Sequence, residues 1–188
     1  MTTYYGYVDV PHSSYDEWRS ATIGNMYDLD GWWSGQCWDY CALCYAQYGL
    51  TLYTGNPGVA KNCWLQSKSL NTRDPFIAVE GVQNIKRGDI IVFDGGFAGH
   101  IAFADEDYNG TSRLNCLGQN QRGNGSGYPA TVDNLNLNEF LGIFRNTNWQ
   151  GSPSPTPESG YNKHRYNFVL FNRRKRQEKW TRKPLKRR

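Results

Sequence analysis

Two residues of the types that carry out acyl transfer, Cys37 and His100, stand in contexts that suit the reaction. Cys37 lies at the start of segment 36–48, whose apolar residues recur at helical spacing, so unpaired backbone amides and the helix dipole would stabilise its thiolate. His100 begins the predicted strand 100–104. An imidazole facing a helix-borne cysteine can take the thiol proton and return it to a leaving amine. Taken alone, either residue is more often structural.

A third polar group is expected to hold the imidazole in one tautomer. The segment 116–120 reads CLGQN, and on a strand residues 118 and 120 share one face. Gly118 has no side chain, so Asn120 is the predicted partner of His100. The alternative is that Asn120 is a turn residue at a strand end.

Three acidic residues surround the predicted nucleophile: Asp28, Asp30 and Asp39. Carboxylates that converge beside backbone carbonyls suit a hard cation such as calcium. An EF-hand is excluded because Trp33 stands where that loop needs glycine. Solvated loop acids are the alternative. The nearby pair Cys41 and Cys44 lies on an apolar helical face without a second such pair, which favours core packing over zinc.

The elements that would position these residues divide into helices first and short strands second. A capping box beginning at Ser14 predicts a helix towards Ile23, and further helices are expected at 36–48 and after Pro57 to Leu65, with a loop at 25–35 between the first two. Strands are predicted at 76–79, 89–93, 100–104, 113–119 and 141–144, with the turn pair 109–110 between two of them. This order predicts an α+β fold with an antiparallel sheet.

Composition indicates one folded domain and an appendage. The 188 residues include 38% hydrophobic and 15% aromatic residues, which excludes global disorder. Residues 161–188 carry a net charge of +11, whereas residues 1–160 carry −7. Segment 150–160 is rich in Pro, Ser and Gly, so we expect a domain at 1–149, a linker at 150–160 and a basic arm at 161–188. No signal peptide or membrane span is expected.

The basic arm should bind a polyanion: nucleic acid, teichoic acid or an acidic partner surface. The alternative is a disordered, solubilising tail. The residues predicted to make these contacts are Arg173, Arg174, Lys175, Arg176, Lys186, Arg187 and Arg188.

Four blocks together resemble the CHAP domain, the cysteine, histidine-dependent amidohydrolase/peptidase family. They are Gly35-Gln36-Cys37-Trp38-Asp39, the run 86–93 (KRGDIIVF), Gly99-His100-Ile101-Ala102 and Gly118-Gln119-Asn120, and the resemblance covers residues 10–148. It implies a papain-like fold with N-terminal helices on an antiparallel sheet. It also implies peptidoglycan cleavage of the kind carried out by phage lysins on Gram-positive walls, as an amidase or endopeptidase. Cys37 would then be the nucleophile, His100 the general base and acid, and Asn120 the polar partner.

The resemblance adds further expectations. The oxyanion hole would use the Cys37 amide, with Gln36 as a contributor. Some family members bind calcium through matching aspartates and carbonyls, here Asp28, Asp30 and Asp39 with the carbonyls of Trp32 and Ser34; no organic cofactor is expected.

Many members have Glu-Gln-Asn where this chain has Gly118-Gln119-Asn120. Either Asn120 serves alone, an acid from elsewhere substitutes, or activity is reduced. The protein would be made in the host cytoplasm, then act in the phage tail or on the wall after lysis. A virion-associated lysin anchored by its arm to tail protein or DNA is favoured over a free endolysin. An inactive structural protein whose arm is the functional part is the remaining alternative.

Overall fold

The computed structural model describes residues 1–122 and 127–149. The predicted linker at 150–160 and the basic arm at 161–188, with all its proposed contact residues, lie outside this range. The helices are α1 (Tyr15–Thr22), α2 (Cys37–Gln47), α3 (Asn62–Leu65) and α4 (Lys68–Asn71), with 3₁₀ turns at Val82–Asn84, Leu137–Glu139 and Thr147–Trp149. The strands are β1 (Thr3–Tyr5), β2 (Met26–Asp28), β3 (Phe76–Val79), β4 (Ile90–Phe93), β5 (His100–Ala104), β6 (Arg113–Gly118), β7 (Thr131–Asn136) and β8 (Phe140–Asn146).

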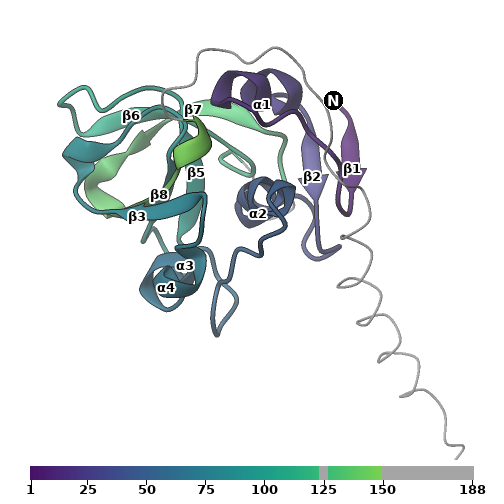
Figure 1. Cartoon of the computed structure of the whole chain (residues 1–188), viewed down its shortest axis with the longest axis horizontal. Coiled ribbons are helices and arrows are strands. Elements are labelled where there is room, and N and C mark those ends of the chain that lie inside the picture. Colours follow the sequence, from purple (N-terminus) through teal and green to yellow (C-terminus); the bar gives the residue numbers. More distant parts are fainter. Residues whose placement is uncertain (123–126, 150–188) are drawn as a thin grey trace, which may run out of the picture. The chain divides into compact units, whose positions relative to one another are not determined.

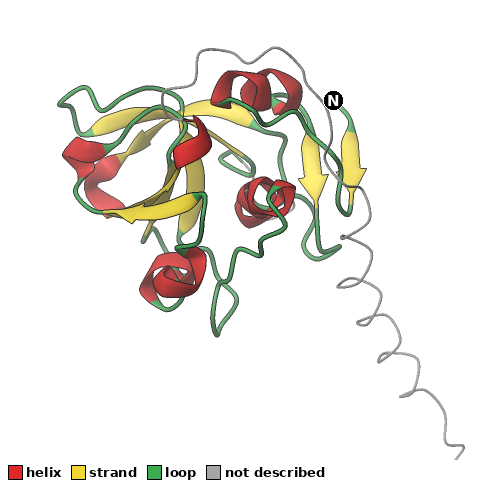
Figure 2. Cartoon of the chain, in the orientation of Figure 1, coloured by secondary structure: helices red, strands yellow, loops and turns green. Residues whose placement is uncertain are grey.

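The main sheet, whose strands are yellow in Figure 2, has the strand order β3-β8-β4-β5-β6-β7. Every neighbouring pair is antiparallel. This confirms the α+β prediction. Apolar side chains cover both faces of the sheet, because alternate residues of a strand point to opposite sides. In β4, Ile90 and Val92 face the cluster that includes α2, whereas Ile91 and Phe93 join a second cluster on the other face. The uninterrupted apolar run of β4 follows from burial on both sides.

Helix α2 lies between the main sheet and the small parallel pair formed by β1 and β2 (Figure 1). Its residue Tyr40 is fully buried and contacts Phe103 of β5 edge to face, with ring centroids 5.4 Å apart. Cys41 and Cys44 are both buried in the same cluster. Their place in the core agrees with the packing interpretation, and the core fixes α2 against β5.

The local signals for α1 and α2 are confirmed. The Ser14 hydroxyl accepts a hydrogen bond from the Glu17 amide and caps α1, while Gly49, with a φ of 72°, follows the end of α2. The helix expected after Pro57 begins only at Asn62.

Several expectations about the rest of the chain are wrong. The predicted loop 25–35 contains β2, which pairs in parallel with β1 and gains its backbone bonds from that distant strand. Strand β7 and helix α4 were not predicted, and the β5–β6 connection that contains Gly110 is longer than a two-residue turn.

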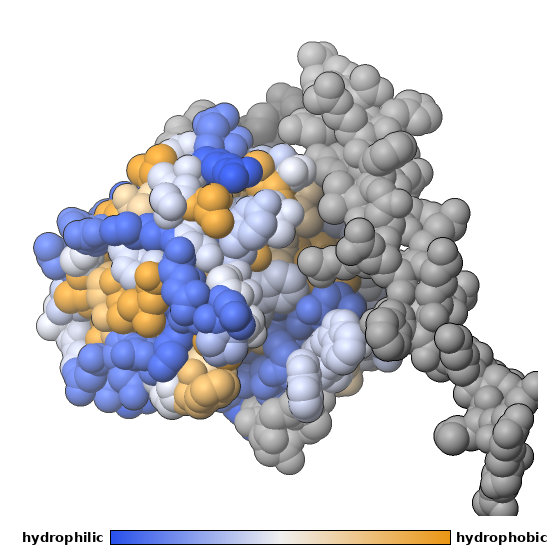
Figure 3. All heavy atoms as spheres, turned by 90° about the horizontal axis from the view of Figure 1, so that it is seen from below, coloured by the Kyte–Doolittle hydropathy of each residue, from blue (hydrophilic) through white to orange (hydrophobic). Residues whose placement is uncertain are grey.

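Polar and apolar residues are interspersed on the surface shown in Figure 3, where the apolar residues form separate patches between hydrophilic ones. None of the helices within the described residues combines the length and apolar character needed to cross a bilayer.

Candidate active site and carboxylate cluster

Cys37 is the first residue of α2, and a network of buried amides holds the chain in front of it. Gln36, the N-cap residue, is extended, with φ −90° and ψ 168°. The Asp39 carboxylate accepts hydrogen bonds from the backbone amides of Gln36 (2.8 Å) and Leu29 (2.9 Å). Asp39, at the third position of α2, therefore binds the amide of the N-cap residue Gln36. Through Leu29 it also connects the acidic loop to the start of the helix.

Gln119, directly after β6, is fully buried and joins three parts of the site. Its Nε2 donates to the carbonyls of Tyr27 and Gln36, each at 2.9 Å, and its Oε1 accepts from the Tyr27 amide at 2.6 Å. Gly35 permits this approach, because a Cβ there would lie 2.9 Å from Gln119 Nε2 and 2.8 Å from the Tyr27 carbonyl oxygen. The quoted motif contained Gln119, but its positioning role could not be read from the sequence.

The structure places Cys37 beside the start of β5, the strand that His100 begins. His100 is the first residue of β5, opposite Phe93, and the next backbone amide, that of Ile101, acts on the Cys37 thiol. Burial raises the pKa of Cys37 to about 11 and outweighs the amides of Ile101 and Trp38, which lower it. The expected thiolate stabilisation by the helix start is thus present but smaller than the effect of burial.

Burial also dominates the titration of the imidazole. It lowers the pKa of His100 to about 4, and the neighbouring carboxamide of Gln121, which favours the protonated ring, opposes that shift. Among the described residues, no carboxylate contributes to the shift. At neutral pH the unliganded site therefore holds a neutral thiol and a neutral imidazole, and the imidazole can act as the base when substrate enters.

Asn120, the predicted partner of His100, has a left-handed backbone with a φ of 54°. Its Nδ2 donates to Gln36 Oε1 at 2.7 Å, and its Oδ1 is buried without a hydrogen bond among the described residues. Asn120, His100 and Gln121 line one pocket of about 180 Å³ together with Phe93, Leu135, Asn136 and Glu139. Asn120 thus lies in the site, while the polar side chain that opposes the fall in the pKa of the imidazole is that of Gln121, which sequence reasoning missed.

Gln36, the expected oxyanion contributor, is held at both ends of its carboxamide. Its Oε1 accepts from Asn120, and its Nε2 donates to the Trp33 carbonyl. Trp33 and Ser34 both have left-handed backbones, with φ values of 63° and 61°. A strained loop of this kind is stable only where its surroundings hold it, as they do in front of Cys37.

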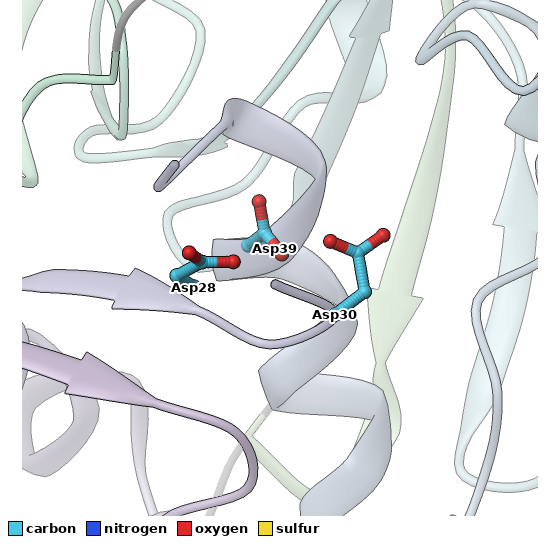
Figure 4. A group of neighbouring side chains, drawn as sticks. All are labelled: Asp28, Asp30 and Asp39. Atoms are coloured by element: carbon cyan, nitrogen blue, oxygen red, sulfur yellow. The ribbon is translucent and has the colours of Figure 1, made fainter. Parts of the chain in front are cut away.

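The three acidic residues form the expected cluster (Figure 4). Each of Asp28, Asp30 and Asp39 offers an oxygen, and these oxygens lie within 4.8 Å of one another. Asp28 and Asp39 are buried, and burial together with the charges of Asp30 and Asp28 raises the pKa of Asp39 to about 7. Oxygen donors that repel one another when ionised fit a calcium ion. Participation of the Trp32 and Ser34 carbonyls stays a prediction.

Comparison with known proteins gives three findings. A family model for the CHAP domain matches residues 24–120, just over half of the 188-residue chain. The chain is 30% identical over 162 residues to a D-alanyl-L-alanine endopeptidase of Streptococcus phage B30, covering 82% of this chain and 35% of that protein, about a third of its length. The crystal structure of the wild-type endolysin LysIME-EF1 is similar in fold, with a TM-score of 0.58 and 21% identity, covering 70% of this chain and 63% of that one.

Proposed function

Because the chain belongs to the CHAP domain family, we propose that it is a peptidoglycan hydrolase of a phage that infects Gram-positive bacteria, cleaving an amide bond through Cys37. The observation that carries this proposal is the position of Cys37, at the start of α2, beside the backbone amide of Ile101, which follows His100 in β5. The endopeptidase name of the phage B30 relative supports a stem or cross-bridge bond, and an amidase is the other candidate.

The proposed reaction starts from the neutral thiol of Cys37 and the neutral imidazole of His100. His100 takes the Cys37 proton as the sulfur attacks the substrate carbonyl, forming an S–C bond and an oxyanion. The Cys37 amide, with Gln36 as a contributor, would donate hydrogen bonds to that oxygen. Collapse of the intermediate breaks the C–N bond while His100 gives its proton to the leaving amine. Water then attacks the thioester, His100 takes the water proton, and the acid product leaves as the thiol is restored.

We also propose calcium as a structural ion of this site. Asp28, Asp30 and Asp39, with the carbonyls of Trp32 and Ser34, would hold it. The ion would offset the repulsion among the carboxylates and fix the loop in front of Cys37. Support comes from the 4.8 Å convergence of the three oxygens and from the buried position of Asp39.

For the biological setting we propose a virion-associated lysin that the basic arm anchors to tail protein or packaged DNA, with a free endolysin bound to wall teichoic acid as the alternative. The support is the net charge of +11 on residues 161–188. Deletion of 161–188 should remove association with particles and leave cleavage of soluble wall fragments intact. Particle association that survives the deletion would contradict the anchoring role.

Zymography on purified Gram-positive walls tests the enzymatic proposal. The wild-type protein should clear the wall layer, and a folded Cys37→Ala protein should not. Mass spectrometry of the released fragments then identifies the bond. If neither protein cleared any wall, the proposal would fail in favour of an inactive structural protein.

A further inference from the structure

The side chain of Gln121 occupies the space beside the catalytic imidazole, three residues beyond the end of β6. Its Nε2 donates hydrogen bonds to the carbonyls of Cys116, at 3.0 Å, and Thr131, at 2.6 Å. A carbonyl oxygen can only accept a hydrogen bond, so the atom of Gln121 that faces these two carbonyls must be its NH₂ nitrogen. The two bonds therefore assign Nε2 and Oε1 of the carboxamide. The acceptor Oε1 is therefore the end of the carboxamide that makes neither of these bonds.

Three buried polar atoms of the residues that line that pocket lack an aligned hydrogen bond among the described residues: Gln121 Oε1, His100 Nε2 and Asn120 Oδ1. Gln121 and His100 line the same pocket, and the Gln121 side chain is close enough to the ring to oppose the fall in the pKa of His100. An acceptor oxygen and a ring nitrogen that can donate are thus buried in the same pocket. Catalytic hydrogen bonds are often poorly aligned before substrate binds.

Gly118 makes this arrangement possible. A Cβ at position 118 would lie 3.2 Å from both Cδ and Oε1 of Gln121 and 2.9 Å from the Ala102 Cβ. Any side chain at 118 would therefore compete with Gln121 for the same volume beside β5. The Gln121 side chain can therefore occupy this volume only because residue 118 is a glycine.

We propose that Gln121 is the residue that positions His100, by accepting a hydrogen bond from its Nε2–H through Oε1. This inference rests on the proposed function, since it names the third member of that site. With Nε2 protonated, Nδ1 is the nitrogen that receives the Cys37 proton. A carboxamide cannot ionise, so it holds the ring in one tautomer without adding a charge, and it stabilises the imidazolium less than a carboxylate would.

The histidine tautomer is the direct test. In folded Cys37→Ala protein at pH 7.5, long-range ¹H–¹⁵N spectra should show the His100 ring protonated on Nε2. Gln121→Met keeps the length of the side chain but removes the acceptor, so the ring should lose this preference and populate both tautomers. A ring protonated on Nδ1 in the protein that keeps Gln121 would overturn the proposal, whether or not Gln121→Met folds.

Activity supplies the second readout. In otherwise wild-type protein, Gln121→Met should lower kcat by about 10- to 100-fold with little change in KM, because ring orientation matters in the transition state. Arg122→Ala is the matched control, since the neighbouring Arg122 is exposed and pairs with Asp133. A kcat within twofold of wild type for Gln121→Met, with the Nε2–H tautomer retained, would overturn the proposal.

Asn120 is the competing acceptor because its Oδ1 is also buried and unpaired among the described residues. Asn120→Ala should leave the Nε2–H tautomer in place. Loss of the tautomer in Asn120→Ala, but not in Gln121→Met, would transfer the role to Asn120. The spectra do not depend on wall cleavage, so failure of the enzymatic proposal and failure of this one give different results.

Discussion

Gln119 Nε2 donates a hydrogen bond of 2.9 Å to the carbonyl of Gln36, the residue immediately before the proposed nucleophile Cys37. The same carboxamide holds both the amide and the carbonyl of Tyr27 in β2. One buried side chain therefore connects the end of β6, the start of α2 and the small parallel sheet. This connection and the helix that Cys37 begins both help to position the thiol.

Replacement of Gln119 by leucine should destabilise the whole domain. The change leaves the amide and carbonyl of Tyr27 and the carbonyl of Gln36 without partners, at about 1–3 kcal/mol for a buried unpaired group. We expect a loss of roughly 3 kcal/mol in the free energy of unfolding, measured by urea denaturation. Gln83→Leu, on the 3₁₀ turn Val82–Asn84 that contains no buried residue, is the control and should change it little. An unchanged midpoint for Gln119→Leu would contradict the connecting role.

Gly118→Ala should impair both stability and catalysis. The new Cβ would lie 2.9 Å from the Ala102 Cβ and 3.2 Å from Gln121, so β5 or the Gln121 side chain must move. We expect about 1–3 kcal/mol lower stability, as for other overpacked cores, and slower wall clearing. Gly58→Ala is the control, because its Cβ would make only an ordinary contact of 3.5 Å with Thr54. If Gly118→Ala had the stability and the clearing rate of the wild-type protein, the space between residue 118, Ala102 and Gln121 would not be restricted.

Calcium should raise the melting temperature of the protein by several degrees, as expected for an ion present at about 100 times its Kd. The raised pKa of Asp39, about 7, exceeds that of an unfolded carboxyl, so without metal its contribution to stability falls as the pH rises from about 4 to 7. The calcium effect should therefore be larger at pH 8 than at pH 5. Differential scanning fluorimetry with calcium or with a chelator measures it.

Asp39→Asn should abolish the calcium-dependent shift, because it removes a charged ligand from the cluster. Asp9→Asn, at an exposed aspartate, should keep the full shift. Equal melting temperatures with calcium and with chelator in the wild-type protein would argue against the ion.

The sequence was sufficient for those parts of the site in which residue type and regular periodicity agree. Cys37 at a helix start and His100 at a strand start follow from local patterns, and the structure places Cys37 beside the backbone amide of Ile101, the residue after His100. The assignment of a partner to His100 used strand alternation through residue 120, but β6 ends at Gly118 and Asn120 adopts a left-handed backbone. Alternation does not hold beyond a strand end, so Gln121 was missed.

The unpredicted strands have a related cause, because each depends on a partner that is distant in the sequence. β1 and β2 are three residues each and lie more than twenty residues apart. β7, with the sequence TVDNLN, lies at the edge of the sheet, and none of its residues is buried. Its sequence therefore shows no apolar face that would predict a strand. Tertiary pairing, rather than local propensity, fixes these segments.

The stability of the protein should fall as the pH decreases from 6.5 to 4, in part because of His100. Burial holds the pKa of the folded-state imidazole at about 4, below its ordinary value of 6.5, so in this window the unfolded chain binds a proton that the folded protein does not. The stabilising contribution is complete above pH 6.5 and is lost as the pH falls, by about 1–3 kcal/mol in total. His100→Gln removes the titrating group and leaves all other acids and bases in common. The difference in unfolding free energy between wild type and His100→Gln, measured in urea at several pH values, should therefore shrink or reverse from pH 6.5 to pH 4. A difference that stays constant over this range would contradict the buried, neutral state of the imidazole.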